Sequence, residues 1–248
     1  MGILSKLFGH KTSQHPYCAA LVPAAGTSSR MGGLDKLFYD LYGQPVLART
    51  LLALDRCDRI DEIVVAARQE NILRIGELCR TYNIRKPVKI VEGGKTRAES
   101  VLQAALSADA RAEFLAVHDG ARPLIEQSVI EETIQKAYQC AAAAPATPVK
   151  DTIKVVDEEQ RAVQTPDRRT LWQVQTPQAF SYELILKAYD RVIASGEQSV
   201  TDDAQVLELA FGRTCRLIEG SYQNIKVTTP EDLDIAQVFL KKIWKNVK

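Results

Sequence analysis

The sequence predicts an α/β fold with a mostly parallel sheet, because short apolar runs alternate with longer segments whose apolar residues recur at helical spacing. A chain of 248 residues, 46% of them hydrophobic, is long enough to bury one substantial core of this kind. The apolar runs that we expect to form strands are residues 19–22, 62–66, 88–91 and 114–117. A sheet of this class binds its ligands in the crevice at the carboxyl ends of its strands.

Helices are expected between these strands and after them. Residues 46–54 place apolar side chains at near-helical spacing, and Pro45 suits a first helical turn. The last expected helix follows the sequence NIKVTTP, where Thr229 before Pro230 is typical of a helix cap. This last helix is expected at residues 231–239, and the other segments with helical periodicity are 72–82, 98–106, 183–193 and 202–209.

The pattern changes between residue 149 and about residue 176. Short β-rich pieces alternate there with polar turns such as DEEQ, which predicts an arm or a hairpin. An arm that projects from a compact domain buries its apolar residues better against a second copy of the chain. We therefore expect a symmetric dimer.

Composition excludes several classes of function. The 32 basic and 31 acidic residues give a formal charge of +1, so no overall positive field predicts binding to nucleic acid or to an anionic membrane. Five scattered cysteines without a CxxC pair predict neither a disulfide framework nor a zinc site and fit a reducing cytoplasm. Residues 1–16 hold too short an apolar stretch for a signal peptide or a membrane span, and we interpret them as an N-terminal extension.

Three polar loops follow the expected strands at one edge of the sheet. They are PAAGTSSRMGG, EGGKTRAES and HDGARP. Glycines in the first loop allow main-chain N–H groups to approach a ligand, and Arg30 and Lys36 supply the charge that a polyphosphate requires. The loop lacks the GxGxxG and GxxxxGK[ST] patterns, which argues against the usual dinucleotide and P-loop sites. Taken singly, a simple turn explains the glycine-rich loop as well as a ligand site does, and solvated surface positions explain Arg30 and Lys36 better than a site does.

The remaining polar residues have two interpretations each. In HDGARP, Asp119 and Arg122 fit a capped turn as well as a binding site. His118 is better explained as a positioned loop residue than as a metal ligand, because the other two histidines lie in the extension. Lys226 in NIKVTTP is either a binding-site residue or the solvated end of a strand, where a lysine amine often reaches water.

The motifs PAAG, RM, K, GG, RAES, VHDGARP, PVKDT, TPQ, TDDA and NIKVTTPEDL occur in this order. Each is weak alone, but together they closely resemble the 2-C-methyl-D-erythritol 4-phosphate cytidylyltransferases from Tyr17 to about Leu240. The resemblance implies a Rossmann-like nucleotidyltransferase domain at residues 17–243, with a dimerisation arm at about 149–176. It also implies transfer of the cytidylyl group of CTP to methylerythritol phosphate, with release of pyrophosphate, in non-mevalonate isoprenoid biosynthesis.

The same resemblance implies a role for each site residue. Arg30 and Lys36 would oppose charge on the transferred phosphorus and the leaving pyrophosphate, and Asp119 would lie near a Mg²⁺ ion or another divalent cation. The implied catalytic residues are Arg30, Lys36, Asp119 and Lys226. The implied CTP-binding residues are Ala24, Ala25, Gly26, Gly94, Lys95 and Ser100, of which the last three match the cytosine-recognition region. The implied substrate-binding residues are Arg122, Thr152, Arg168, Thr201 and Lys226, with Thr152 and Arg168 donated by the neighbouring subunit.

Some positions depart from the family pattern, and three rival functions stay open. Ser28 stands where the family often has a second glycine, the interval from Arg30 to Lys36 is one residue shorter, and Lys95 replaces a frequent aspartate. A ribitol-5-phosphate cytidylyltransferase shares the same nucleotide loops. A sugar-1-phosphate nucleotidyltransferase would show a longer nucleotide loop. A nucleotide sensor without turnover is a different class, and the joint presence of the four implied catalytic residues argues against it.

Overall fold

The computed structural model describes residues 15–246 except 27–30, 33, 198 and 199. In this part of the chain, one mixed sheet of eight strands has the order β10-β5-β9-β4-β1-β2-β3, with β8 paired to β5. Six of the eight run in the same direction, and β8 and β9 run antiparallel to their neighbours. Their bounds are β1 Cys18–Ala24, β2 Glu62–Ala67, β3 Val88–Glu92, β4 Phe114–Val117, β5 Ala142–Pro148, β8 Trp172–Val174, β9 Gln178–Ser181 and β10 Arg216–Glu219. The predicted α/β class with a mostly parallel sheet is confirmed.

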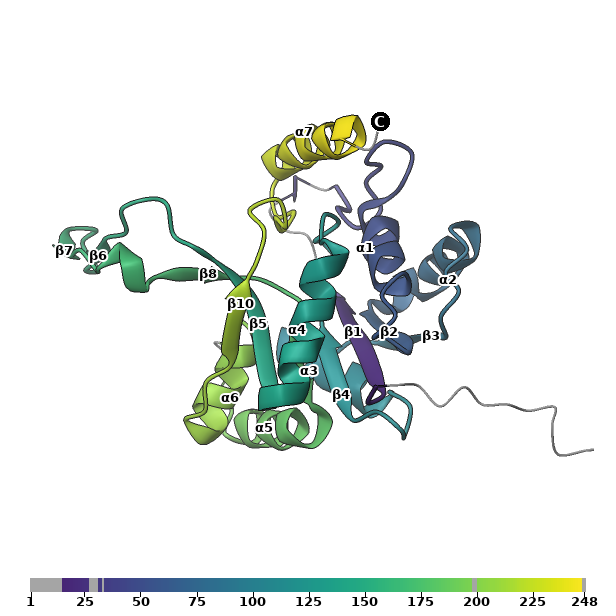
Figure 1. Ribbon diagram of the computed structural model, residues 1–248, viewed down its shortest axis with the longest axis horizontal. Coiled ribbons are helices and arrows are strands. Elements are labelled where there is room, and N and C mark those ends of the chain that lie inside the picture. Colours follow the sequence, from purple (N-terminus) through teal and green to yellow (C-terminus); the bar gives the residue numbers. More distant parts are fainter. Residues whose placement is uncertain (1–14, 27–30, 33, 198–199, 247–248) are drawn as a thin grey trace, which may run out of the picture.

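Helices cover both faces of this sheet (Figure 1). Cys18, Ala20 and Val22 of β1 belong to the buried cluster under α1, α2, α4 and α7. The alternate residues Ala19 and Leu21 belong to the buried cluster under α3, α5 and α6. Successive side chains of a strand point to opposite faces, so a strand buried on both faces is apolar throughout. The helices are α1 Val46–Asp55, α2 Ile72–Thr81, α3 Arg97–Leu106, α4 Gln127–Cys140, α5 Tyr182–Ala194, α6 Asp203–Phe211 and α7 Pro230–Asn246.

All four predicted strands and all six predicted helices are present, with ends that differ by a few residues. The largest shift extends the last helix to Asn246. Four elements were not predicted: α4, β5, β9 and β10. The sequence of β5 is AAAPATP, in which alanine favours helix, yet its first six residues are buried between the two helical layers. Tertiary burial therefore decides this segment against its local preference.

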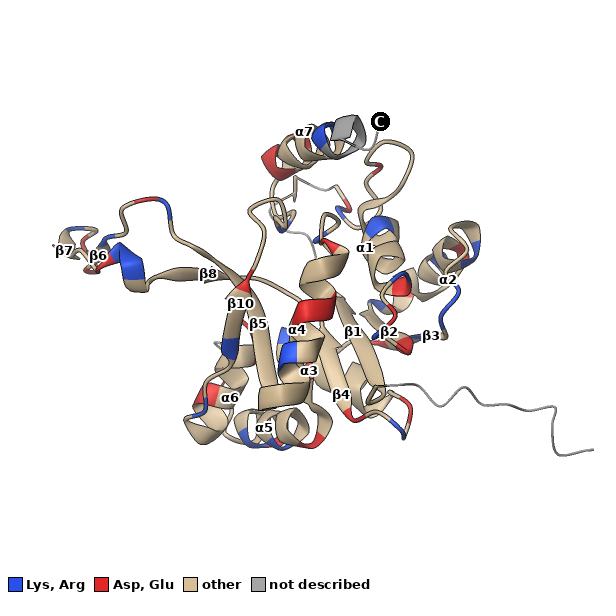
Figure 2. Cartoon of the chain, in the orientation of Figure 1, with Lys and Arg blue, Asp and Glu red and all other residues tan. Residues whose placement is uncertain are grey.

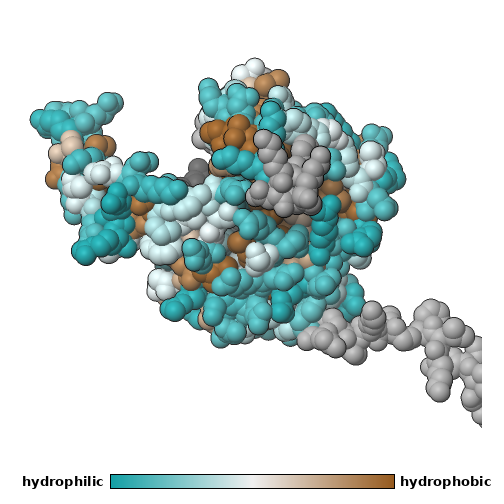
Figure 3. Space-filling model, turned by 45° about the horizontal axis from the view of Figure 1, so that its top comes forward, coloured by the Kyte–Doolittle hydropathy of each residue, from teal (hydrophilic) through white to brown (hydrophobic). Residues whose placement is uncertain are grey.

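The arm projects from the body, as the sequence predicted (Figure 1). Its outer part is the two-stranded antiparallel sheet of β6 (Val155–Val156) and β7 (Ala162–Gln164), and β8 leads back to the main sheet. Val156 and Val163 are more than half exposed in the single chain. Figure 3 shows hydrophobic residues at the surface of the arm. An isolated two-stranded sheet is marginally stable in water, so the arm needs more cover than its own chain supplies.

Charged residues of both signs are spread over the described chain. Figure 2 shows basic and acidic residues interspersed over the helices and the arm. Within the described residues, no helix combines the length and the apolar character that crossing a membrane requires.

Candidate functional site

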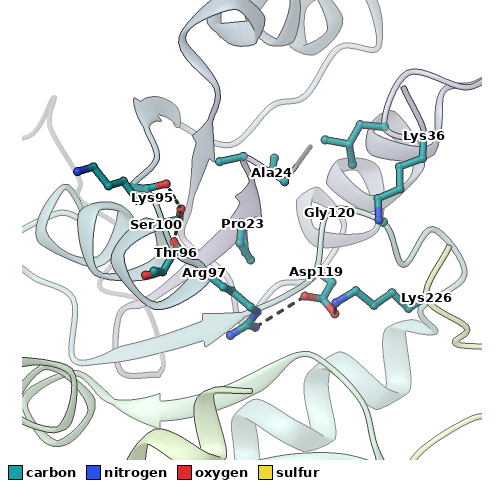
Figure 4. Close-up of a pocket in the computed structure, with 15 residues that line it drawn as sticks. Pro23, Ala24, Lys36, Lys95, Thr96, Arg97, Ser100, Asp119, Gly120 and Lys226 are labelled. Atoms are coloured by element: carbon teal, nitrogen blue, oxygen red, sulfur yellow. Dashed lines mark hydrogen bonds and ion pairs between the residues drawn. The ribbon is translucent and has the colours of Figure 1, made fainter. Parts of the chain in front are cut away.

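The three polar loops meet at the carboxyl ends of β1, β3 and β4, as predicted, and enclose a pocket (Figure 4). Its wall combines loop backbone with a few charged side chains, and Lys36 lines it from the segment that follows the first loop. The predicted site residues that line this first pocket are Ala24, Ala25, Gly26, Lys36, Gly94, Lys95, Ser100, Asp119 and Lys226.

The second loop packs tightly because it contains two glycines. A Cβ atom on Gly93 would lie 2.6 Å from the Ala25 Cβ, and one on Gly94 would lie 2.3 Å from the Glu99 Cβ. Both contacts are too short for a real side chain, so only glycine lets this loop lie against the first loop and against α3. The main chain of the loop thereby becomes part of the pocket wall.

A capping box fixes the start of α3 at this loop. The Thr96 hydroxyl accepts the Glu99 N–H at 3.1 Å, and Glu99 Oε2 accepts the N–H groups of Thr96 at 3.2 Å and Lys95 at 2.7 Å. The Lys95 N–H is therefore already used within the chain. The Lys95 side chain is exposed and points away from the pocket in Figure 4.

Ser100 is the buried hydroxyl of the first pocket. It lies on the first turn of α3 and donates to the Thr96 carbonyl at 2.9 Å, with the Gly94 carbonyl at 3.3 Å. Because one hydroxyl has a single hydrogen and two lone pairs, its oxygen can still accept a hydrogen bond from a ligand in the pocket.

Asp119 is surrounded by three cations. Its Oδ2 lies 3.1 Å from Lys226 Nζ and 3.2 Å from Arg122 Nε, and its Oδ1 lies 3.7 Å from Arg97 Nη2. Burial alone would raise the pKa of Asp119, but Lys226, Arg97 and Arg122 together hold that pKa well below its usual range. The carboxylate therefore stays ionised and paired with these cations.

His118 fixes the loop that carries Asp119. Its Nδ1 lies 2.9 Å from the Thr176 hydroxyl and its Nε2 lies 3.3 Å from the Arg122 carbonyl, while Thr176 also accepts the Asp119 N–H at 3.1 Å. The Thr176 hydroxyl therefore donates to Nδ1, and Nε2–H donates to the carbonyl. Burial lowers the pKa of His118 to about 4, so the ring is neutral at pH 7. The interpretation of His118 as a positioned loop residue agrees with these contacts.

A second pocket adjoins the first and shares Arg97, Asp119 and Lys226 with it. Its far side is the start of α6, where Asp202 accepts the Gln205 N–H at 2.9 Å and also the Gln178 amide at 2.9 Å. The predicted substrate-binding residues that line this pocket are Arg122, Thr201 and Lys226.

Arg97 was not among the predicted site residues, although it lines both pockets. It is the first residue of α3, and its guanidinium binds the fully buried Asp203 at the start of α6 through two hydrogen bonds of 2.7 and 2.6 Å. The Tyr189 hydroxyl donates to the same carboxylate. The one signal that could have found Arg97 is its place in RAES, three residues before Ser100.

Some predicted residues lie elsewhere. Arg30 and Ser28 fall outside the described residues. Thr152 and Arg168 lie on the arm, are exposed, and line neither pocket of their own chain. Arg168 donates instead to the Lys150 carbonyl at 2.7 Å.

Comparisons with known proteins agree with this geometry. The family model described as IspD, 2-C-methyl-D-erythritol 4-phosphate cytidylyltransferase, matches residues 18–242. The chain is 44% identical to the protein of that name from Caldanaerobacter subterraneus, over 90% of this chain and 99% of that one. It is also 44% identical to the one from Syntrophotalea carbinolica, over 89% of this chain and 94% of that one.

Solved structures are similar as well. The crystal structure of 4-diphosphocytidyl-2C-methyl-D-erythritol synthase from Anaerococcus prevotii superposes with a TM-score of 0.80 at 32% identity, over 91% of this chain and 98% of that one. The 2-C-methyl-D-erythritol 4-phosphate cytidylyltransferase of Thermus thermophilus superposes with a TM-score of 0.72 at 28% identity, over 91% of this chain and 99% of that one.

Proposed function

The chain belongs to the 2-C-methyl-D-erythritol 4-phosphate cytidylyltransferase family, and we propose that its two adjoining pockets bring the two substrates together at Asp119. It is a nucleotidyltransferase that transfers the cytidylyl group of CTP to methylerythritol phosphate in isoprenoid biosynthesis. The products are 4-diphosphocytidyl-2-C-methyl-D-erythritol and pyrophosphate. The first pocket would hold CTP and the second the polyol phosphate.

The observation that carries this arrangement is the shared wall of Arg97, Asp119 and Lys226. A phosphate oxygen of methylerythritol phosphate must attack the α-phosphorus of CTP, so two anions have to approach each other. The three cations around Asp119 reduce the repulsion at that place, and Asp203 offsets part of the charge of one of them, Arg97. The substrate phosphate is already a nucleophile, so the protein supplies position and charge and forms no covalent intermediate.

Within the first pocket, Lys36 and Arg30 would bind the CTP phosphates and oppose the charge of the leaving pyrophosphate. Lys36 lines the pocket beside Ala24, Ala25 and Gly26, whose backbone would contact the nucleotide. The Gly94 and Lys95 backbone and the Ser100 hydroxyl, at the start of α3, would recognise cytosine. Because the Lys95 N–H already binds Glu99, we assign no donor role to that amide.

Asp119 is the residue that would hold a divalent cation, which we propose to be Mg²⁺. Its Oδ2 is paired with Lys226 and Arg122, whereas the one charged group of the described residues near Oδ1 is Arg97, at 3.7 Å, so this oxygen is available as a ligand. Mg²⁺ commonly binds one or two carboxylates together with substrate phosphates and waters. When bound, the metal would supply positive charge to the CTP phosphates.

The arm would complete the second pocket in a homodimer. Thr152 and Arg168 line neither pocket of their own chain, and the valines of the outer arm are exposed. A second copy that covers these valines would also bring Thr152 and Arg168 towards a neighbouring site. Lys226, Arg122 and Thr201 would bind the polyol phosphate from the same chain.

We place the enzyme in the cytoplasm. All five cysteines are free thiols, as is usual in a reducing compartment.

The test is pyrophosphate release from Mg·CTP with methylerythritol phosphate and, in parallel, with ribitol 5-phosphate. We expect strong turnover with methylerythritol phosphate alone. A preference for ribitol 5-phosphate would keep the chemistry and change the acceptor. Tight CTP binding with no turnover of either acceptor would instead indicate a nucleotide sensor.

A further inference from the structure

Arg97 occupies the junction of the two pockets, where the reacting groups must meet. It lines both pockets, together with Asp119 and Lys226. Its side chain is 24% exposed, whereas the carboxylate that it binds, Asp203, is completely buried. One part of Arg97 is therefore fixed in the protein interior, and the rest faces the pockets.

The buried part of the contact fixes the orientation of the guanidinium. Nη1 and Nη2 donate to the two oxygens of Asp203 at 2.7 and 2.6 Å, which is a bidentate pair. The hydroxyl of the fully buried Tyr189 donates to Asp203 Oδ1. Burial, followed by the negative charge of Asp203, raises the pKa of Tyr189 well above its usual value, so this hydroxyl remains a donor.

The adjacent edge of the guanidinium, formed by Nε and the second N–H of Nη2, has no bidentate partner among the described residues. A guanidinium carries five N–H donors in a planar fork, and Asp203 accepts from two of them. Among the described residues, the other approach on this edge is Asp119 Oδ1, at 3.7 Å from Nη2, which is an ion pair too long for a hydrogen bond. Figure 4 shows Arg97 directed towards Asp119 at the centre of the pocket.

The ion pair of Lys89 and Glu62 shows what a purely structural contact looks like in this protein. Glu62 is also a buried carboxylate, 2% exposed, and Lys89 Nζ lies 3.1 Å from it. Glu62 is at the start of β2, away from the carboxyl ends of the strands, and neither Glu62 nor Lys89 lines the first or the second pocket. Arg97 differs because it lines both pockets and carries N–H groups that Asp203 does not use.

We propose that Arg97 is a further catalytic residue, whose Nε and Nη2 edge binds a phosphate at the junction of the two pockets, and that Asp203 and Tyr189 are positioning residues for it. A planar fork binds a phosphate through two parallel N–H groups, which a lysine cannot reproduce. The bound phosphate is either the α-phosphate of CTP or the phosphate of the polyol substrate. This inference rests on the proposed function.

The test compares Arg97→Lys, Tyr189→Phe and the control Lys89→Gln with the wild-type enzyme. We expect Arg97→Lys to lower kcat about 10²-fold, because it keeps the charge but loses the fork. Tyr189→Phe keeps the ring and removes one donor to Asp203, so kcat falls about 5-fold. Lys89→Gln lowers the melting temperature and leaves kcat unchanged. A rise in KM for CTP or for methylerythritol phosphate identifies which phosphate Arg97 binds.

The inference is overturned if Arg97→Lys lowers only the melting temperature, as Lys89→Gln does, with kcat and both KM values at wild-type levels. If Arg97→Lys does not fold by circular dichroism, Tyr189→Phe decides, and an unchanged kcat in that variant overturns the proposal. If the wild type itself turns over neither polyol phosphate, the proposed function fails. Calorimetry of Mg·CTP then decides about Arg97: 10-fold weaker binding in Arg97→Lys supports the phosphate contact, and equal binding overturns it.

Discussion

The first pocket, which we propose to bind the nucleotide, and the arm are stabilised in opposite ways. In the pocket, Asp119 and His118 are buried and bonded to residues from distant parts of the same chain. On the arm, the contacts of Arg168 and Arg169 are with nearby residues, and both side chains are exposed. One half of the site is therefore built by a single chain, and we expect the other half to be completed by a second copy.

The difference follows from the strength of the contacts. Exposed ion pairs such as Arg169 with Asp167 are screened by water and contribute little to stability. The buried pairs around Asp119 carry a large penalty if one partner is removed. The pocket should therefore keep its shape in a monomer, whereas the shape of the arm should depend on association.

The largest expected effect tests the pocket alone. We expect Lys36→Ala to lower turnover by roughly 10²-fold or more, because Lys36 lines the first pocket, which we propose to hold CTP, and would stabilise developing phosphate charge. Steady-state pyrophosphate release measures this effect. The control is Lys187→Ala on α5, whose side chain is 70% exposed and lies outside both pockets. The oligomeric state and the melting temperature should not change in either variant. Wild-type turnover in folded Lys36→Ala would contradict the role of Lys36.

The second prediction tests how much the buried, neutral His118, which contacts the Asp119 loop, contributes to the free energy of unfolding. The folded-state pKa of His118 is lowered by burial from 6.5 to about 4. The unfolded chain therefore binds the proton first, and the stability supplied by neutral His118 is complete above pH 6.5 and is lost as the pH falls towards 4. A shift of this size corresponds to about 3 kcal/mol.

Urea unfolding of the wild type and of His118→Gln between pH 7 and pH 4 measures this contribution. The free energy of unfolding of the wild type should fall by about 3 kcal/mol more than that of the variant. The other titrating groups are common to both proteins and cancel in the difference. Parallel curves for the two proteins would show that His118 does not control the acid sensitivity of the loop.

Sequence patterns predicted the fold because local and tertiary preferences agree in most elements. The strands from β1 to β4 are apolar runs, and α1 and α3 have one apolar face each. The agreement fails at β5, where an alanine-rich strand follows α4 directly. Only burial between two helical layers makes that segment a strand, and burial is a property of the whole fold.

The loops of the site were predictable from the strand ends, and the motif resemblance placed the distant Lys226 and Thr201 at the site as well. The contacts that position the site residues were not predicted. The three loops could be placed together because parallel strands end at one edge of the sheet. The partner of Arg97, Asp203, is 106 residues away, and Thr176 is 58 residues from His118. No spacing rule connects residues so far apart, so the positioning contacts required the structure.

The third prediction tests the arm alone. We expect Val163→Asp to dissociate the dimer, because it places a charge on an exposed apolar side chain that the second copy would cover. Use of methylerythritol phosphate should fall roughly 10-fold while the affinity for CTP stays the same. The control is Leu73→Asp, which places the same charge on the 82% exposed Leu73 of α2. Analytical ultracentrifugation gives the oligomeric state, and a monomer with full activity would exclude shared active sites.

The smallest expected effect is confined to CTP. Ser100→Ala removes a buried hydroxyl that lines the first pocket. We expect KM for CTP to rise about 5-fold, because the loss of one hydrogen bond to the ligand has an effect of this size. Ser107→Ala is the matched control, because the Ser107 hydroxyl also bonds a backbone carbonyl, at 2.9 Å, but lies partly buried at the other end of α3 and outside both pockets. KM for methylerythritol phosphate should not change in either variant. An equal rise in both KM values for Ser100→Ala would mean that the loop at the start of α3 shapes both pockets. The first pocket would then not act independently of the second, although its contacts lie within one chain.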